Sequence, residues 1–218
     1  MPAAQHRTKR LAGALAFLVL LAGGAASADA AVVTLHAAPA AAGAANCSSQ
    51  ANVCTIANAV TTANSTPTSN SVEIKLAGGS YALGGMLTIS FAGPSLTISP
   101  ESGTPTLDGG GVHRPLRVGA GTNVTLDGLV IEDGKAPLGN AAGAIVNEGT
   151  LTIRRSRVTT SQGNSGGAIQ NSSGATLMIE DSTFAQNSAI AGSGGAIISY
   201  GVAATILARF GRQTTLVL

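Results

Sequence analysis

The residues that could do chemistry are carboxylates and arginines in the second half of the chain. The carboxylates are Asp127, Glu132, Asp133, Glu180 and Asp181, and the arginines are Arg154, Arg155 and Arg157. A pair of carboxylates can hydrolyse a glycosidic bond, and a calcium group beside an Arg or Lys base can support lyase chemistry. These residue types therefore raise the hypothesis of a polysaccharide hydrolase or lyase.

An internal repeat determines where such residues lie. The segment GAIVN at 143–147 recurs as GAIQN at 167–171 and as GAIIS at 195–199, in steps of 24 and 28 residues. We expect the isoleucines to stack as one interior ladder, the glycines to permit turn angles that other residues avoid, and the amides to hydrogen-bond along the stack. A ligand-binding row of amides is the alternative role for the asparagines. These residues are Ile145, Ile169 and Ile197, then Gly143, Gly167 and Gly195, and finally Asn147 and Asn171.

A second repeated segment has the period of a β-strand. LTIRRSRV, which begins at Leu151, recurs 26 residues later as LMIEDSTF, and VTLDGLVI lies 27 residues earlier. Apolar residues alternate within each copy, which is typical of a strand with one buried face. In the register that this alignment gives, Val118 corresponds to Ile145 and Ile169.

The period of the repeat indicates the fold. A unit of about 26 residues without helical periodicity cannot bury its apolar face alone and must stack on the next copy. We therefore predict an all-β fold, a right-handed parallel β-helix of about five coils and about 25 Å in height. It is expected over residues 72–200, after a leader and cap at 31–71. A leucine-rich repeat, a propeller, a calcium-binding nonapeptide roll and an antiparallel sandwich fit the period and the motifs less well.

This registration favours a structural role for the charged residues. Asp127 is expected in line with Arg154 and Glu180, as an exterior row of alternating charge. Arg155 is expected over Asp181. No two carboxylates are expected at the same register on adjacent coils, as a shared metal or sugar site would favour. We therefore expect no catalytic residue, no metal ion and no cofactor.

The composition limits the range of partners. Only 10% of the 218 residues are charged, and the formal net charge is +2. That charge is too small to indicate binding to nucleic acid or to an acidic membrane surface. The glycines that follow Asp108, before His113 and Arg114, lack the helix and the GK[ST] sequence of a phosphate-binding loop, so we interpret them as a turn.

The first 30 residues are typical of a secretory signal peptide. Basic residues precede an apolar run, Leu11 to Leu21, which is followed by small residues that end in Ala28-Asp29-Ala30. The apolar run is short of the roughly 20 residues that a membrane-spanning anchor needs. We therefore expect a secreted or cell-surface protein.

The chain has two cysteines, Cys47 and Cys54. In an exported protein we expect a disulfide between them, in preference to a metal site or free thiols. Closing so small a loop stabilises a fold by about 2–3 kcal/mol on the chain-entropy estimate.

Short motifs add a family resemblance. GGAI at 166–169 and 194–197 and FAQN at 184–187 resemble the GGAI and FxxN repeats of polymorphic outer-membrane proteins. From about Cys47 to Tyr200 the chain also resembles bacterial surface β-helix proteins that carry an N-terminal CSLREAI motif.

The string CTIANAVTTAN at 54–64 matches this motif but lacks its Arg-Glu pair. The resemblance implies a short N-terminal helix that caps the first coil. It also implies an exported, often surface-attached protein without demonstrated chemistry.

The repeat pattern ends at Tyr200, and residues 201–218 are atypical, with an apolar end at 214–218. We expect a truncated or frame-shifted reading of a longer repeat protein, with further coils missing. The predicted function is a non-catalytic surface module, adhesin-like or structural, whose candidate partners are surface glycans and proteins of a host or cell surface. An incomplete polysaccharide lyase or hydrolase is the alternative.

Overall fold

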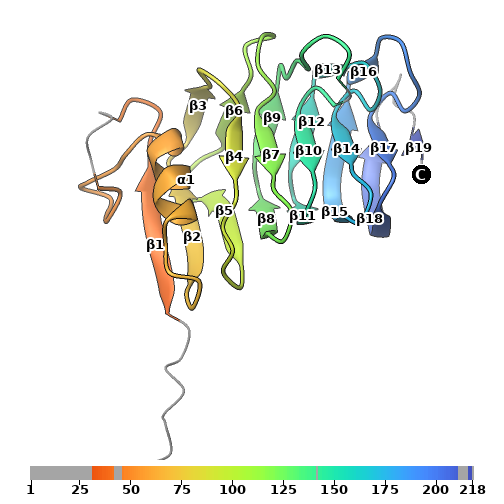
Figure 1. The fold of residues 1–218 in the computed structure, drawn as a ribbon. Coiled ribbons are helices and arrows are strands. Elements are labelled where there is room, and N and C mark those ends of the chain that lie inside the picture. Colours follow the sequence, from red (N-terminus) through yellow and green to blue (C-terminus); the bar gives the residue numbers. More distant parts are fainter. Residues whose placement is uncertain (1–30, 42–45, 141, 211–215, 218) are drawn as a thin grey trace, which may run out of the picture.

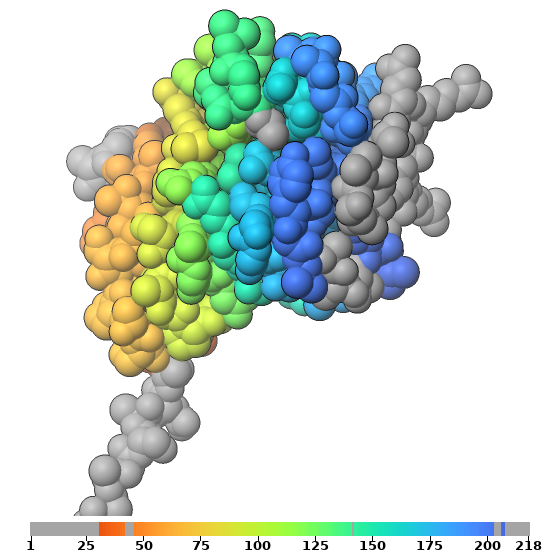
Figure 2. All heavy atoms as spheres, turned by 45° about the vertical axis from the view of Figure 1, so that its right-hand side comes forward, coloured from red at the N-terminus to blue at the C-terminus, as the bar shows by residue number. Residues whose placement is uncertain are grey.

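The protein is a parallel β-solenoid of about five turns with one short helix near its N-terminal end (Figure 1). The computed structural model describes residues 31–41, 46–140, 142–210 and 216–217. The expected signal peptide at 1–30 lies outside the described residues. Each coil contacts the next along the solenoid, so the coils follow one another as bands of colour in Figure 2.

Every strand pairs in parallel with the strand one coil away, and the strands form three walls. The first wall contains β1 (Val32–Ala37), β2 (Ser71–Leu76), β5 (Leu96–Pro100), β8 (Asn123–Asp127), β11 (Thr150–Arg154) and the first half of β15 (Thr176–Ala185). The second wall contains β3 (Gly79–Ala82), β6 (Pro105–Asp108), β9 (Val130–Glu132), β12 (Arg157–Thr159) and the second half of β15. The third wall contains β4 (Leu87–Ile89), β7 (Leu116–Val118), β10 (Ile145–Asn147), β14 (Ile169–Asn171), β17 (Ile197–Ser199) and β19 (Leu216–Val217). A short pair, β13 (Gln162–Gly163) with β16 (Ser188–Ala189), lies between the second and third walls in sequence.

Alternation of apolar and polar residues produces these walls. In β11 the side chains of Leu151 and Ile153 are buried, while Thr152 between them is partly exposed. The same positions stack from coil to coil, so that Leu151 pairs with Val124 on one side and with Leu177 on the other. Each coil therefore provides the apolar floor for the next, as the repeat predicts.

The third wall has a register that the sequence alignment did not give. The prediction that Val118 corresponds to Ile145 is wrong, because β7 pairs Leu116 with Ile145 and Val118 with Asn147. The turn that follows β7 spans 119–122, whereas the turn that follows β10 spans only 148–149. The longer turn shifts the preceding strand by two residues, which keeps the same side chains inward but changes their partners.

The helix α1 (Ile56–Asn64) stands where the first coil would otherwise have its third-wall strand, beside β4 (Figure 1). Thr55 is its N-cap, and the Thr55 hydroxyl accepts a hydrogen bond from the backbone N–H of Asn58 at 3.2 Å. At the other end, the amide of Asn64 donates to the Thr88 carbonyl at 2.9 Å and accepts from the Ser90 N–H at 2.9 Å. These two bonds cover backbone groups beside the exposed edge of the third wall, which is the capping role that the resemblance implies.

The sheets continue past the end of the sequence repeat. The strand β18 (Val202–Phe210) pairs in parallel with β15, with register shifts near Leu177 and Glu180. Parallel pairing needs only backbone hydrogen bonds, so a segment without the repeat motif can still extend the wall. Residues 211–215 and 218 of the atypical tail lie outside the described residues.

Candidate functional site

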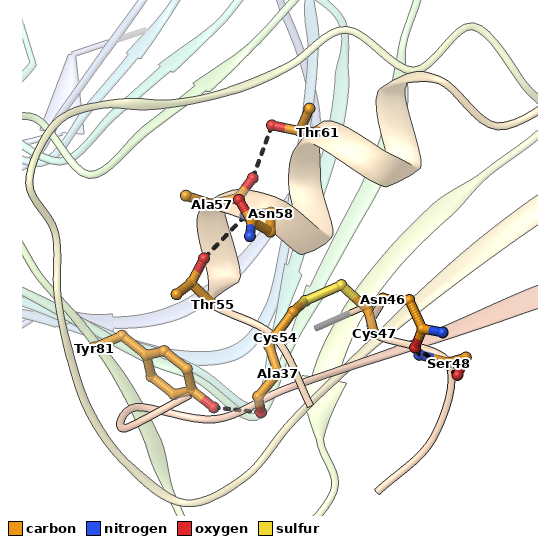
Figure 3. Close-up of a disulfide and its surroundings, with 10 residues drawn as sticks. All are labelled: Ala37, Asn46, Cys47, Ser48, Cys54, Thr55, Ala57, Asn58, Thr61 and Tyr81. Carbon is orange, nitrogen blue, oxygen red and sulfur yellow. Dashed lines mark hydrogen bonds between the residues drawn. A yellow bond between two sulfur atoms is a disulfide. The ribbon is translucent and has the colours of Figure 1, made fainter. Parts of the chain in front are cut away.

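The two cysteines form the expected disulfide beside the first coil (Figure 3). Both side chains are buried. Backbone bonds hold the cysteine segment against β1: the His36 N–H donates to the Cys47 carbonyl at 2.8 Å, and the Cys54 N–H donates to the His36 carbonyl at 3.0 Å. The disulfide therefore fixes the segment 47–54, which leads into the N-cap of α1.

Replacing both cysteines with alanine is expected to lower the free energy of unfolding by about 2–3 kcal/mol, because the unfolded chain regains the freedom of the closed loop. Urea denaturation measures this change. Hydrogen exchange should rise first at the amides of His36, Ala38 and Cys54, whose bonds the disulfide supports. An unchanged denaturation midpoint would show that the disulfide contributes no stability.

The three turn glycines lie where the chain enters the third wall. We expected these glycines to adopt turn angles that other residues avoid. That prediction is wrong for Gly143 and Gly167, because neither has a positive φ. A Cβ on Gly143 would lie 2.6 Å from the carbonyl oxygen of Gly167. One on Gly167 would lie 2.6 Å from the carbonyl carbon of Ser188 and closer still to the oxygen of Gly195. These glycines are required by close backbone packing, and the left-handed residue is the one before each: Ala142, Gly166 and Gly194.

The isoleucines and asparagines of the repeat lie in two inward columns of the third wall. Ile145, Ile169 and Ile197 are in register and fully buried. The Asn147 amide donates to the Asn171 oxygen at 2.7 Å, and the Asn171 amide donates to the Ser199 hydroxyl at 3.0 Å. Both asparagines are fully buried, so this arrangement satisfies turn groups inside the wall and offers no surface for a ligand.

Sequence reasoning missed a set of buried polar residues at the corners between walls. They are Ser156, Ser161, Ser182 and Asn187. Each follows a residue with positive φ, and the side chain of each accepts a hydrogen bond from a backbone N–H one coil away. For example, the Ser156 N–H donates to the Ser182 hydroxyl at 3.2 Å, and the Ser161 N–H donates to the Asn187 oxygen at 3.0 Å. The signal in the sequence is a small polar residue at the same register after Arg155, Thr160, Asp181 and Gln186.

A charged hollow lies on the outer face of the first wall. It has a volume of about 340 Å³. Its lining residues come from β2, β5, β8 and β11 and the turns after them: Glu73, Lys75, Thr97, Ser99, Pro100, Asp127, Gly128, Arg154 and Arg155. We call it the first-wall groove. It brings together three candidate residues of the sequence analysis, Asp127, Arg154 and Arg155. Glu73 and Lys75 also line it, and the repeat alignment did not include them.

Asp127 is the most buried charged group in the groove, and its residue is only 8% exposed. As expected, it is in register with Arg154, which in turn pairs with Glu180. The Arg154 Nε lies 3.1 Å from Asp127 Oδ2, and the Arg155 guanidinium donates to the same oxygen. Arg155 therefore forms its ion pair with Asp127 on the preceding coil, which the expected alignment of Arg155 with Asp181 did not include.

A second group of carboxylates lies on the second wall. Asp108 on β6 pairs in register with Glu132 on β9, so the prediction that no two carboxylates share a register on adjacent coils is wrong. Burial raises the pKa of Glu132, the nearby charges of Asp133 and Asp108 raise it further, and Arg157 opposes them. The upstream copy was too weak in sequence for the alignment to reach Asp108. Asp108 and Glu132 do not line the first-wall groove.

The glycine-rich segment after Asp108 forms the expected turn. The Gly110 N–H donates to the Asp108 carboxylate at 2.7 Å, and Gly110 and Gly111 both have positive φ. Next to this turn, His113 and Arg114 line a smaller hollow of about 160 Å³.

Within the described part of the chain, no group of three or more His, Cys, Asp or Glu side chains has a geometry that could hold a metal ion. None of the described helices has the length and apolar character that crossing a membrane requires. Comparison with models of known protein families gave no match, and neither curated proteins nor solved structures matched the chain. The structure thus establishes a parallel β-solenoid, and the family resemblance of its motifs remains a prediction.

Proposed function

We propose that this protein is an exported, non-catalytic β-solenoid module that acts at a cell surface, as an adhesin-like or structural element. The observation that carries the proposal is the form of the molecule, in which three parallel walls each present outward side chains in straight rows. Such walls favour contact with an extended partner along the solenoid over enclosure of a small substrate. The sequence features of residues 1–30 support export.

A second candidate function is a polysaccharide hydrolase or lyase of the β-helix type with an incomplete site. The observation that favours it is the pair Asp108 and Glu132, since hydrolysis of a glycoside needs two carboxylates, one of them a proton donor with a raised pKa. We rank it second because neither carboxylate lies in the groove that holds Asp127, Arg154 and Arg155.

Two measurements test the proposed function. The purified protein is expected to leave polygalacturonate and alginate at their original length. The full sequence is then expressed in a bacterium with an outer membrane. We expect the protein either to be secreted into the medium or to stay on intact cells, where added protease digests it. A chain that lacks residues 1–30 is the control and should stay inside the cell. Polymer cleavage that is lost in Glu132→Gln or Asp127→Asn would overturn the non-catalytic proposal.

A further inference from the structure

The first-wall groove has the direction that a linear polymer would follow. Outward residues of successive strands lie in register across it: Glu73 pairs with Thr97, and Lys75 with Ser99. Further along the same wall, Asp127 pairs with Arg154. Neighbouring strands are about 4.8 Å apart, so a chain lying across them meets a new side chain at each step.

A glycine at the turn after β8 leaves space at the floor of the groove. Gly128 has a φ of 67°, and the left-handed residues of the next two coils there are Arg155 and Asp181. A Cβ on Gly128 would lie 3.1 Å from the ring of Pro100. The hollow is therefore deepened because this coil has no side chain where the next two coils carry a charged one.

The charges in the groove leave an excess of cationic donors. Lys75 pairs with Glu73 at 2.6 Å, but Arg154 and Arg155 share a single oxygen of Asp127. A guanidinium has five N–H donors in a planar fork that suits carboxylate oxygens. The two arginine side chains are 41% and 62% exposed, so donors remain accessible to an anionic ligand.

Asp127 holds both arginines through only one of its two carboxylate oxygens. Its Oδ1 atom is buried and has no hydrogen-bond partner among the described residues. This oxygen is covered by the protein, so Asp127 acts by holding the two arginines through Oδ2 and makes no direct contact with a ligand. The groove thus offers the exposed donors of two arginines for an acid group.

The groove has no aromatic lining residue on which a neutral sugar ring would stack. Affinity must therefore come from charge-assisted hydrogen bonds, which favours sugars that carry carboxylates.

We propose that the first-wall groove binds a segment of an acidic polysaccharide built of uronate residues, which lies across strands β2 to β11. Sugar carboxylates bind the exposed N–H groups of Arg154 and Arg155, which Asp127 holds in place through Oδ2. This site deepens the proposed function and rests on it, because it names the ligand class of the surface module.

Calorimetric titration of the purified full protein with oligogalacturonate tests the site. The fully methyl-esterified oligomer has the same backbone without the charge, and it is expected to bind at least about tenfold more weakly. The double variant Arg154→Gln with Arg155→Gln is expected to lose a similar factor. The matched control, Arg117→Gln with Arg157→Gln, removes the same charge from the other two walls and should bind as the native protein does.

A further variant covers the case in which loss of both arginines disturbs the fold around Asp127. Lys75→Gln lies at the other end of the groove and is expected to weaken binding about threefold without removing the partners of Asp127. Equal binding of the esterified oligomer, equal losses in the control variant, or equal competition by single-stranded DNA of the same charge would overturn the proposal. Binding combined with polymer cleavage would instead overturn only the non-catalytic function, and surface exposure without glycan binding would overturn only this site.

Discussion

Replacing Gly167 with alanine is expected to lower the free energy of unfolding by about 3 kcal/mol or more. The added Cβ would meet backbone atoms of Ser188 and Gly195 at less than van der Waals distance. Those atoms belong to neighbouring coils and cannot rotate away as a side chain would, so the coils would have to move apart. Urea denaturation of the two proteins, followed by far-ultraviolet circular dichroism, measures the loss.

Gly84→Ala is the matched control for this experiment. Gly84 is exposed, its φ is not positive, and a Cβ there would meet nothing within 4 Å. The control should be neutral or more stable by up to about 1 kcal/mol, because alanine restricts the unfolded chain. If Gly167→Ala were as stable as Gly84→Ala, the coils would not be packed as closely as the structure shows.

Replacing Asn147 with leucine, whose side chain branches at the same carbon but is larger, is expected to destabilise the protein by about 3 kcal/mol or more. The buried Asn147 accepts from the Gly149 N–H at 3.2 Å and donates to the Thr176 carbonyl at 2.8 Å as well as to Asn171. Leucine would leave the Gly149 N–H and the Asn171 oxygen buried without that bond, and each such group costs about 1–3 kcal/mol. The larger leucine would also have to fit into a packed column. Chemical denaturation measures the change.

Asn140→Leu is the control for the asparagine experiment, because Asn140 is exposed and its amide makes only a 3.5 Å contact with the Leu138 carbonyl. We expect it to change stability by less than about 0.5 kcal/mol. Similar effects of the two substitutions would contradict a structural role for the Asn147–Asn171 column.

The parts of the fold that could be predicted from the sequence are those where like residues recur at one spacing. Ile145, Ile169 and Ile197 recur with their flanking glycines, so the third wall follows from the sequence over these coils. The helix α1 could be placed from its matching string at 54–64, whereas the capping role of Thr55 came only from the structure. The predicted pairing of Val118 with Ile145 was wrong, because the alternation of apolar residues in a strand does not reveal the length of the turn that follows it.

The candidate site was harder to predict for the same physical reason. Asp127 and Arg154 were aligned from the repeat, but Glu73 and Lys75 lie on β2, in a coil whose sequence has diverged from it. The pair Asp108 and Glu132 was missed because stacking depends on backbone pairing, which residues of any type can make. The unpaired Oδ1 of Asp127 depends on side-chain directions that no alignment gives.

Distances between spin labels on one outward row of the first wall test the stacking of coils most directly. Thr34, Glu73, Thr97, Thr125, Thr152 and Met178 follow one another in register on successive strands. Cysteines introduced at 34 with 125, 152 or 178 can be labelled selectively, since both native cysteines are in the disulfide. Double electron–electron resonance should give distances that grow by about 4.8 Å per coil, to about 14, 19 and 24 Å between the backbone positions. Distances that do not increase in equal steps would contradict a parallel solenoid.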